Sequence, residues 1–308
     1  MTKTAFLFSG QGAQKLGMAR DLYDQYETVK ATFDEASQAL GYDLRALIDN
    51  DEEKLNETKY TQPAILTTSV AILRLLSENG IKPDLVAGLS LGEYSALVAS
   101  GIIDFQEAVK LVAKRGQYMT EAAPTGSGKM VAVMKTDPAL IEEICQKAAE
   151  FKGGIVSPAN YNTPAQIVIG GEVEAVDYAV ELLKEAGVRK LIELKVSGPF
   201  HTAILKAASE KLALELDKID FRPFELPLIS NTSAKVMEND EVKGLLTRQV
   251  MEPVRFYESV ETMQKLGATR FIEVGPGRVL SGFIKKIDKN AEIANVENLA
   301  SFEALINQ

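Results

Sequence analysis

A short apolar run meets a serine between two glycines in the segment DLVAGLSLGEYSALVAS, residues 84–100. The run that ends at Gly88 predicts a buried strand, and the run that follows Gly92 predicts a helix. A strand that turns directly into a helix predicts a parallel sheet, because parallel strands need helical crossovers between them. The segment also fits G-x-S-x-G, in which a strained strand-to-helix turn exposes the serine hydroxyl at the carboxyl edge of a sheet.

Ser90 is therefore a candidate nucleophile, and the positive end of the following helix would favour negative charge that develops beside it. A simpler interpretation fits the same residues. Ser90 and Glu93 have the spacing of a capping box, so the hydroxyl could merely cap the helix. The motif alone leaves the nucleophile and the cap both open.

Helical and strand patterns alternate along most of the chain. The first strand is expected within KTAFLFSGQGAQ and a late one within FIEVG. Helices are expected over residues 18–25, 27–40, 63–79, 91–100 and 104–119. Pro63 suits the first position of its helix, and Asp104 suits a helix cap. We predict an α/β fold with a doubly wound, mostly parallel sheet of the hydrolase-like type.

The order of the expected elements changes after residue 125. A strand, a helix, two strands, a helix and a strand are expected, over residues 129–134, 138–150, 155–170, 174–186 and 191–196. This β-α-β-β-α-β order is typical of a ferredoxin-like α+β unit. We expect residues 126–196 to form such an inserted subdomain, and residues 1–125 and 197–308 to form the large α/β catalytic domain.

The composition excludes several classes of protein. A formal net charge of −9 argues against a nucleic-acid or membrane-surface partner, since both need clustered Lys and Arg. The single cysteine, Cys145, excludes an internal disulfide and a metal site of several thiolates. No run approaches the ~18 apolar residues of a membrane span, and the run after Met1 is too short for a signal peptide. A cytoplasmic location is expected.

His201 is the only histidine, so histidine-dependent chemistry must use it. It follows a Gly-Pro turn just past an expected strand, in GPFHT, and catalytic residues gather in such loops. A serine nucleophile needs a base, which is usually an imidazole. The alternative is an ordinary histidine at a helix entry. No acidic residue stands out as a third member, so a backbone carbonyl could orient the ring.

Arg115 falls on the apolar face of its expected helix, three residues after Val112 and four before Met119. A guanidinium keeps its charge, so a buried one needs an anionic partner. That partner could be an internal carboxylate, such as Glu93 or Glu121, or the carboxylate of a substrate. Periodicity leaves both open.

The first loop, SGQGAQ, offers backbone N–H groups to a phosphate or to an oxyanion. It is not a dinucleotide fingerprint, because Lys15 stands where the third glycine belongs. The segment APTGSGKM resembles a phosphate loop but precedes an expected strand instead of following one. No metal motif is present, so no metal is expected.

Six ordered motifs together resemble the malonyl-CoA:acyl carrier protein transacylase family of fatty-acid synthesis, over essentially the whole chain. They are FSGQGAQ, YTQPAI, GLSLGEYSAL, RGQYM, GPFHT and EVGPGRVL. The resemblance implies an acyltransferase that forms an acyl-serine on Ser90. It further implies that His201 is the general base, that Arg115 binds the malonyl carboxylate, and that the backbone carbonyl of Gln249 holds the histidine.

Further roles come from the same resemblance. The backbone N–H groups of Gln11 and Leu91 would form the oxyanion hole, and Gln62, Asn160 and Gln166 match positions that line the cleft. Phe200 resembles malonyl-selective members, whereas Leu89 departs from the family, which usually has histidine before the nucleophile.

The implied substrate is malonyl-CoA, and the implied partner is an acyl carrier protein that carries phosphopantetheine; no cofactor and a monomer are expected. The carrier is expected to be acidic, like this chain, so a local basic patch must overcome their repulsion. The candidates are Lys129, Lys184, Arg189, Lys190 and Lys195, whereas an ordinary solvated face is the simpler interpretation of most of them. The rival functions are a serine esterase or thioesterase and a non-catalytic binding module.

Overall fold

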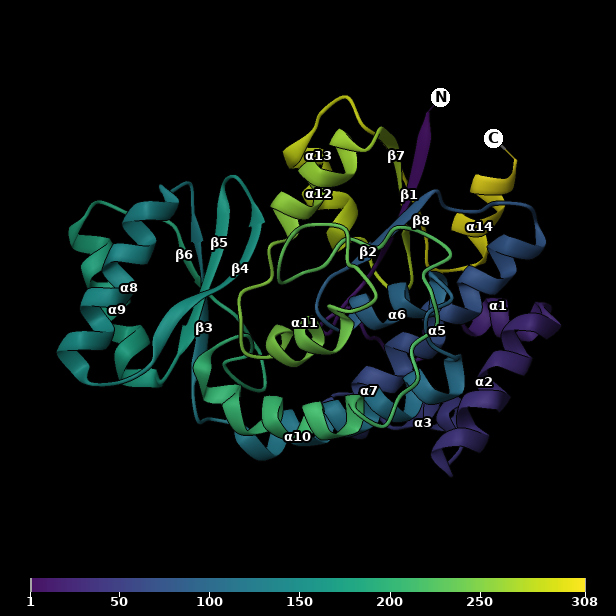
Figure 1. Cartoon of the computed structure of the whole chain (residues 1–308), viewed down its shortest axis with the longest axis horizontal. Coiled ribbons are helices and arrows are strands. Elements are labelled where there is room, and N and C mark those ends of the chain that lie inside the picture. Colours follow the sequence, from purple (N-terminus) through teal and green to yellow (C-terminus); the bar gives the residue numbers. More distant parts are fainter. Residues whose placement is uncertain (1, 308) are drawn as a thin grey trace.

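The computed structural model describes residues 2–307, which form two units side by side (Figure 1). The larger unit is built on a four-stranded parallel sheet in the order β2-β1-β7-β8. Its strands are β1 (Lys3–Phe8), β2 (Leu85–Gly88), β7 (Ala268–Val274) and β8 (Glu292–Val296). The predicted α/β fold with a parallel sheet is therefore confirmed.

Helices cover both faces of this sheet, so alternate side chains of β1 lie in two different apolar cores. Phe6 and Phe8 lie in a core shared with the helices that precede residue 123, whereas Ala5 and Leu7 lie in a second core shared with helices over residues 256–287. All of these side chains are fully buried. Both faces of the sheet are apolar, as expected for a doubly wound sheet.

The helices of the larger unit differ in part from those expected. They are α1 (Arg20–Gln25), α2 (Glu27–Leu40), α3 (Leu44–Asn50), α4 (Glu52–Leu55), α5 (Thr58–Glu78), α6 (Leu91–Ala99), α7 (Phe105–Ala122), α10 (Lys206–Leu216), α11 (Val242–Gln249), α12 (Phe256–Lys265), α13 (Val279–Ile287) and α14 (Leu299–Ile306), with a 3₁₀ turn η1 (Ala203–Leu205) before α10. The predicted helices over 27–40, 91–100 and 104–119 match α2, α6 and α7 closely.

The prediction that Pro63 begins its helix is wrong, because α5 begins at Thr58 and Pro63 lies inside it. Pro63 has no N–H, so the carbonyl of Lys59 loses its usual helical donor. Close packing holds this first turn in place. A Cβ added at Gly116 of α7 would lie 2.6 Å from the carbonyl oxygen of Thr58. Tertiary contact thus outweighs the local helix-start signal. Asp104 precedes α7 as expected, but its side chain pairs with Arg222 and does not cap the helix.

The smaller unit is the inserted ferredoxin-like α+β subdomain. Its strands and helices follow in the order β3 (Lys129–Met134), α8 (Pro138–Lys152), β4 (Val156–Thr163), β5 (Gln166–Gly171), α9 (Val173–Glu185) and β6 (Leu191–Glu193). The antiparallel sheet has the order β4-β5-β3-β6, which is the order of a ferredoxin-like sheet. Its last strand ends at Glu193, earlier than expected. The boundaries at residues 126 and 196 stay a prediction.

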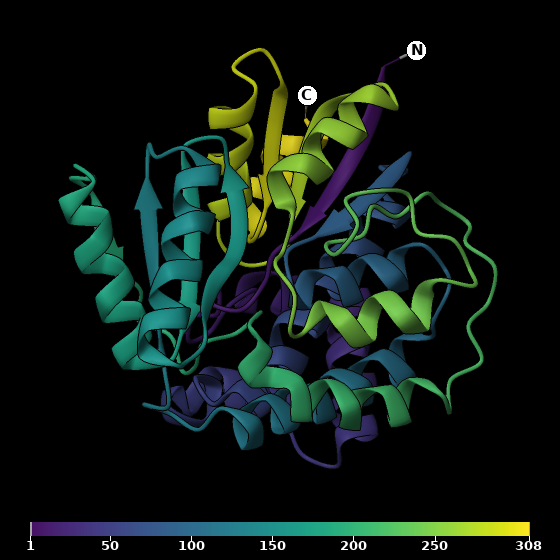
Figure 2. The same ribbon diagram turned by 60° about the vertical axis from the view of Figure 1, so that its left-hand side comes forward.

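The two faces of the smaller sheet have different neighbours. One face packs under α8 and α9, through residues such as Val131 and Ile169. The other face packs against the larger unit, where Met130 and Val168 join Met119 of α7 and Val250 in one apolar core. Figure 2 shows the smaller sheet beside the larger unit from a second direction. The catalytic candidates come from segments next to this junction.

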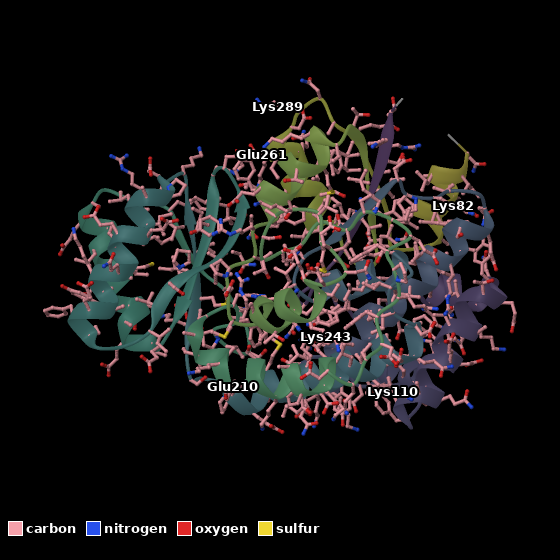
Figure 3. All side chains as sticks on the ribbon, in the orientation of Figure 1. Lys82, Lys110, Glu210, Lys243, Glu261 and Lys289 are labelled. Atoms are coloured by element: carbon pink, nitrogen blue, oxygen red, sulfur yellow. The ribbon has the colours of Figure 1, made fainter. Side chains whose placement is uncertain are left out.

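Charged side chains lie on the outside of the larger unit, as Figure 3 shows for Lys82, Lys110, Glu210 and Lys289. Among residues 2–307, no helix is both long and apolar enough to cross a membrane. The same part of the chain holds no group of three or more His, Cys, Asp or Glu side chains placed to bind a metal ion.

Candidate active site

Ser90 stands in a strained turn between β2 and α6. Its backbone has φ +54° and ψ −106°, a conformation that costs a residue with a side chain about 1–3 kcal/mol. The neighbouring backbone approaches so closely that positions 88 and 92 must be glycine. A Cβ at Gly88 would lie 2.0 Å from the carbonyl carbon of Gly92, and a Cβ at Gly92 would lie 2.0 Å from the carbonyl oxygen of Phe8. The first strand, the second strand and the helix meet at this turn.

The Ser90 side chain does not cap α6, although the residue occupies the cap position. Its Oγ lies 2.8 Å from Nε2 of His201 and accepts a hydrogen bond of 3.2 Å from Nη2 of Arg115. The residue is only 9% exposed. Of the two interpretations left open by the motif, the capping box is therefore wrong for the side chain.

His201 lies in the loop before η1, with φ +59°. Its Nδ1 lies 2.8 Å from the backbone carbonyl oxygen of Gln249, the last residue of α11. Because a carbonyl only accepts hydrogen bonds, Nδ1 carries the proton and the lone pair of Nε2 faces Ser90. Burial, assisted by the charge of Arg115, lowers the pKa of His201 to about 4. The imidazole is neutral at physiological pH and can accept a proton.

Arg115 is a buried cation of α7, 1% exposed, with neutral hydrogen-bond partners. Nη1 donates to Oε1 of Gln62 at 2.9 Å, and Nη2 donates to Oε1 of Gln249 at 2.9 Å. Neither carboxylate considered from the sequence forms an ion pair with it: Glu121 binds Lys211, and Glu93 contacts Gln249 instead. Within residues 2–307, Nε has no hydrogen-bond partner. The guanidinium is charged, desolvated and available to an anion.

Two buried residues near the nucleophile make contacts that the sequence did not predict: Glu93, considered there only as a helix-cap or Arg115 partner, and Asn231, which was missed. Glu93 accepts hydrogen bonds from Nε2 of Gln249 (2.6 Å) and from the backbone N–H of Asn231 (2.9 Å). Asn231 in turn accepts from the backbone N–H of Ser90 at 2.7 Å and donates to the carbonyl of Gly88 at 2.6 Å. Burial raises the pKa of Glu93 to about 7. A carboxylate on an otherwise buried, apolar helix was the sequence signal for Glu93, whereas nothing local marks Asn231.

The loop after β1 lies against the nucleophile turn. The backbone N–H of Leu89 donates to the carbonyl of Phe8 at 3.1 Å, and a Cβ at Gly10 would lie 2.3 Å from the carbonyl oxygen of Leu89. Gln11 follows Gly10, and Leu91 is the first residue of α6. Within the described chain, neither the Gln11 nor the Leu91 backbone N–H donates to another protein group. Both N–H groups are free for an oxyanion.

The remaining predicted positions have varied surroundings. Asn160 of β4 is buried beside Val254, to which its backbone is bridged. Gln166 begins β5 at the β4–β5 turn, opposite Thr163, and its buried Oε1 has no hydrogen-bond partner in the described part of the chain. Phe200 is buried in the core between the two units.

Leu89 packs against an apolar core that includes Phe256, so the place of the usual family histidine is apolar here. Asn162 of β4 is a further buried residue that the sequence did not single out, and its Oδ1 lacks a partner among the described residues.

A family model described as "Acyl transferase domain" matches residues 5–302. The malonyl CoA-acyl carrier protein transacylase of Bacillus subtilis is 46% identical over 308 residues, which cover 99% of this chain and 97% of the relative. The protein of the same name from Escherichia coli K12 is 48% identical over 290 residues, 93% of each chain.

Solved structures agree with these relatives. The crystal structure of MCAT from Streptococcus pneumoniae has a TM-score of 0.97, with 66% identity and 99% of each chain covered. A malonyl-transacylase solved in complex with its type II PKS acyl-carrier protein has a TM-score of 0.95 and 44% identity, with 99% of each chain covered.

Proposed function

This chain belongs to the acyl transferase domain family, and we propose that its Ser90 carries a malonyl group from coenzyme A to the phosphopantetheine thiol of an acyl carrier protein. The chain is an acyltransferase of the malonyl-CoA:acyl carrier protein transacylase type, which supplies fatty-acid synthesis.

The observation that supports the catalytic assignment is the 2.8 Å contact between Ser90 Oγ and His201 Nε2. In the first half-reaction, Oγ attacks the thioester carbon of malonyl-CoA while its proton passes to Nε2. The tetrahedral intermediate then collapses, the C–S bond breaks, and His201 returns the proton to the coenzyme A sulfur. The malonyl group is left as an ester on Ser90. The Gln249 carbonyl stabilises the imidazolium through Nδ1–H.

The oxyanion of the tetrahedral intermediate is assigned to the backbone N–H groups of Gln11 and Leu91. Their freedom from other acceptors supports this role, and each such donor contributes on the order of 3 kcal/mol to lowering the barrier. Leu91 is also the first residue of α6, where the helix dipole favours negative charge.

Arg115 is assigned as the partner of the malonyl carboxylate. Its charge is buried and has only neutral partners, so a carboxylated acyl group supplies the counter-ion that an acetyl group lacks. Gln62 supports this role by holding Nη1. Asn160 and Gln166 are proposed to contact the substrate beyond the acyl group, and Phe200 to limit substituents on it.

In the second half-reaction, the phosphopantetheine thiol gives its proton to His201 and attacks the malonyl ester, and Ser90 recovers its proton as the ester bond breaks. The carrier must dock near this site. Among the basic candidates of the smaller unit, Lys129 already pairs with Asp177 and Glu193. The other four candidates are exposed and belong to no ion pair within residues 2–307: Lys184, Arg189, Lys190 and Lys195. We propose that they receive the acidic carrier.

The remaining expectations stand as parts of the proposal. The protein acts as a monomer in the cytoplasm, needs no cofactor besides its two substrates, and binds neither nucleic acid nor membrane. Its net charge of −9 supports the last two points.

Intact mass spectrometry tests the assignment. After mixing with malonyl-CoA, the protein should gain the mass of one malonyl group, and the Ser90→Ala variant should gain nothing. Labelling of the Ser90→Ala variant would place the nucleophile elsewhere. The relatives' names favour transfer over the hydrolysis of a serine esterase or thioesterase. Rapid loss of the malonyl group in the absence of a thiol acceptor would reverse that preference.

A further inference from the structure

Glu93 is a fully buried carboxylate that the reaction steps above do not use. It lies in the first turn of α6, three residues after the nucleophile. Its two oxygens have different partners: Oε2 accepts from the side chain of Gln249, and Oε1 accepts from the backbone of Asn231. A carboxylate buried at this depth is costly unless its hydrogen bonds compensate for lost hydration, so its placement needs an explanation.

The first partner fixes the direction of an amide. Nε2 of Gln249 donates to Oε2 of Glu93 at 2.6 Å and to the backbone carbonyl of Ser90 at 2.9 Å. Both hydrogens of this NH₂ group are thereby used, and Oε1 is left to accept from Nη2 of Arg115. In the reverse orientation, the NH₂ group would face a guanidinium, which has only donors. The carboxylate therefore determines that Arg115 meets an acceptor.

The second partner fixes the nucleophile turn. Asn231, held through its backbone N–H by Glu93, binds the backbone N–H of Ser90 and the carbonyl of Gly88 with its side chain. The Glu93 carboxylate thus begins two chains of hydrogen bonds, which form the two arms of one network. The arm through Gln249 reaches the residue assigned to the acyl carboxylate, and the arm through Asn231 reaches the residue assigned to the chemistry.

A direct ion pair between Glu93 and Arg115 would occupy the donors that a substrate carboxylate needs. The intervening amide takes one hydrogen of Nη2 and leaves Nε, which has no partner within residues 2–307, to the substrate, while it still connects the buried cation to Glu93. We propose that Glu93 is a positioning residue that makes the site selective for acyl groups ending in a carboxylate. It does so by fixing the Gln249 amide against Arg115. This inference rests on the function proposed above.

The isosteric variant Glu93→Gln tests the proposal. A glutamine has one acceptor oxygen, so it cannot accept from both Gln249 and Asn231. The kcat/KM for loading from malonyl-CoA should fall about tenfold further than that from acetyl-CoA, mainly through KM. The matched control, Asn231→Ala, breaks only the arm to Ser90 and should slow loading from both thioesters by the same factor.

A second variant serves if Glu93→Gln does not fold, as judged by circular dichroism and thermal unfolding. Gln249→Leu keeps the backbone carbonyl that holds His201 but removes the acceptor for Arg115, so it should lower the malonyl-to-acetyl ratio similarly. In the double variant the ratio should fall no further, because both changes break one arm.

Equal losses with both thioesters in Glu93→Gln, or in Gln249→Leu where the first variant is unfolded, would overturn the selectivity role and leave the catalytic assignment intact. Failure of the unaltered protein to form a malonyl-serine would instead remove the premise itself.

Discussion

Arg115 is the residue on which the choice between malonyl and acetyl thioesters should depend. In Arg115→Ala, malonyl loading should fall at least about 100-fold, because two charge-assisted hydrogen bonds to the carboxylate are lost. Acetyl loading should be spared or raised, since no buried charge is then left unpaired. Rates of acyl-enzyme formation from the two thioesters, measured by quenched-flow mass spectrometry, test this. Equal loss with both substrates would contradict a carboxylate-binding role.

His201 should give the pH profile a low acid limb. Its pKa lies at about 4 instead of the ordinary 6.5, because burial and the nearby Arg115 cation disfavour the charged imidazole. The base is neutral above the lowered pKa, so in the Glu93→Gln variant, which has no acid at position 93, kcat/KM for malonyl loading should hold as pH falls to about 5 and decline through about 4. Brief pH-jump loading assays separate this decline from unfolding.

The same shift has a consequence for stability. Between pH 6.5 and about 4, the unfolded chain binds a proton at His201 that the folded chain does not. The His201 contribution to the free energy of unfolding should therefore decrease as pH falls through this window, whereas Glu93, whose pKa burial raises to about 7, should contribute an increase. If kcat/KM for loading instead declined around pH 6.5, the His201 ring would be more hydrated than its 4% exposure indicates.

Sequence alone could identify Ser90 and His201, because each stands in a short motif at the end of an expected strand. It could place Arg115 on a buried face but could not choose its partner, since that choice depends on which carboxylates the fold brings near. Glu93 and Asn231 show the same limit. They are 138 residues apart and joined by a hydrogen bond that no local pattern encodes.

At the scale of elements, the contact between β1 and α6 should tolerate no added atom. In Gly92→Ala, the new methyl group would lie 2.0 Å from the carbonyl oxygen of Phe8. The helix must then move away from the sheet, which should cost about 3 kcal/mol or more of unfolding free energy and abolish loading. Urea denaturation and the mass assay measure the two effects.

The matched control lies in α11. Gly244 is exposed and helical, and an added Cβ there would meet nothing within 4 Å. Gly244→Ala should leave loading unchanged and stabilise the protein by about 0.5–1 kcal/mol, since alanine is the better helix former. A Gly92→Ala protein as stable and active as this control would show that the close approach is not required.

The elements also mark where local patterns suffice. Alternation of apolar runs and turns predicted strands of both sheets, because strands such as β2, β5 and β7 are short, largely buried and followed by a helix, whereas β8 is only partly buried and was not expected. The start of α5 was predicted wrongly, because the signal of Pro63 is weaker than the packing of Thr58 against α7. Helix ends are set by neighbours as well as by their own residues.

At the scale of the whole molecule, this chain has a net charge of −9, and the carrier proposed as its partner is expected to be acidic as well. Because the net charges of the two proteins would repel each other, the exposed basic residues of the smaller unit are the place where we propose that the carrier docks. Arg189 and Lys190 precede the edge strand β6 and Lys195 follows it, and Ile192 and Val196 between and beside them are exposed apolar residues. Such a mixed basic and apolar surface suits an acidic partner.

Reversing charge at this surface should therefore separate the two half-reactions. In Arg189→Glu combined with Lys190→Glu, transfer from the malonyl-enzyme to the carrier should slow on the order of tenfold at low salt, because electrostatic attraction raises the rate of encounter. Loading from malonyl-CoA should be unchanged. Lys82→Glu, at the opposite end of the molecule in Figure 3, is the control and should affect neither step. The difference should shrink as salt rises, since screening weakens attraction between exposed charges. Equal rates of transfer to the carrier by the unaltered protein, the double variant and Lys82→Glu at low salt would place the docking surface elsewhere.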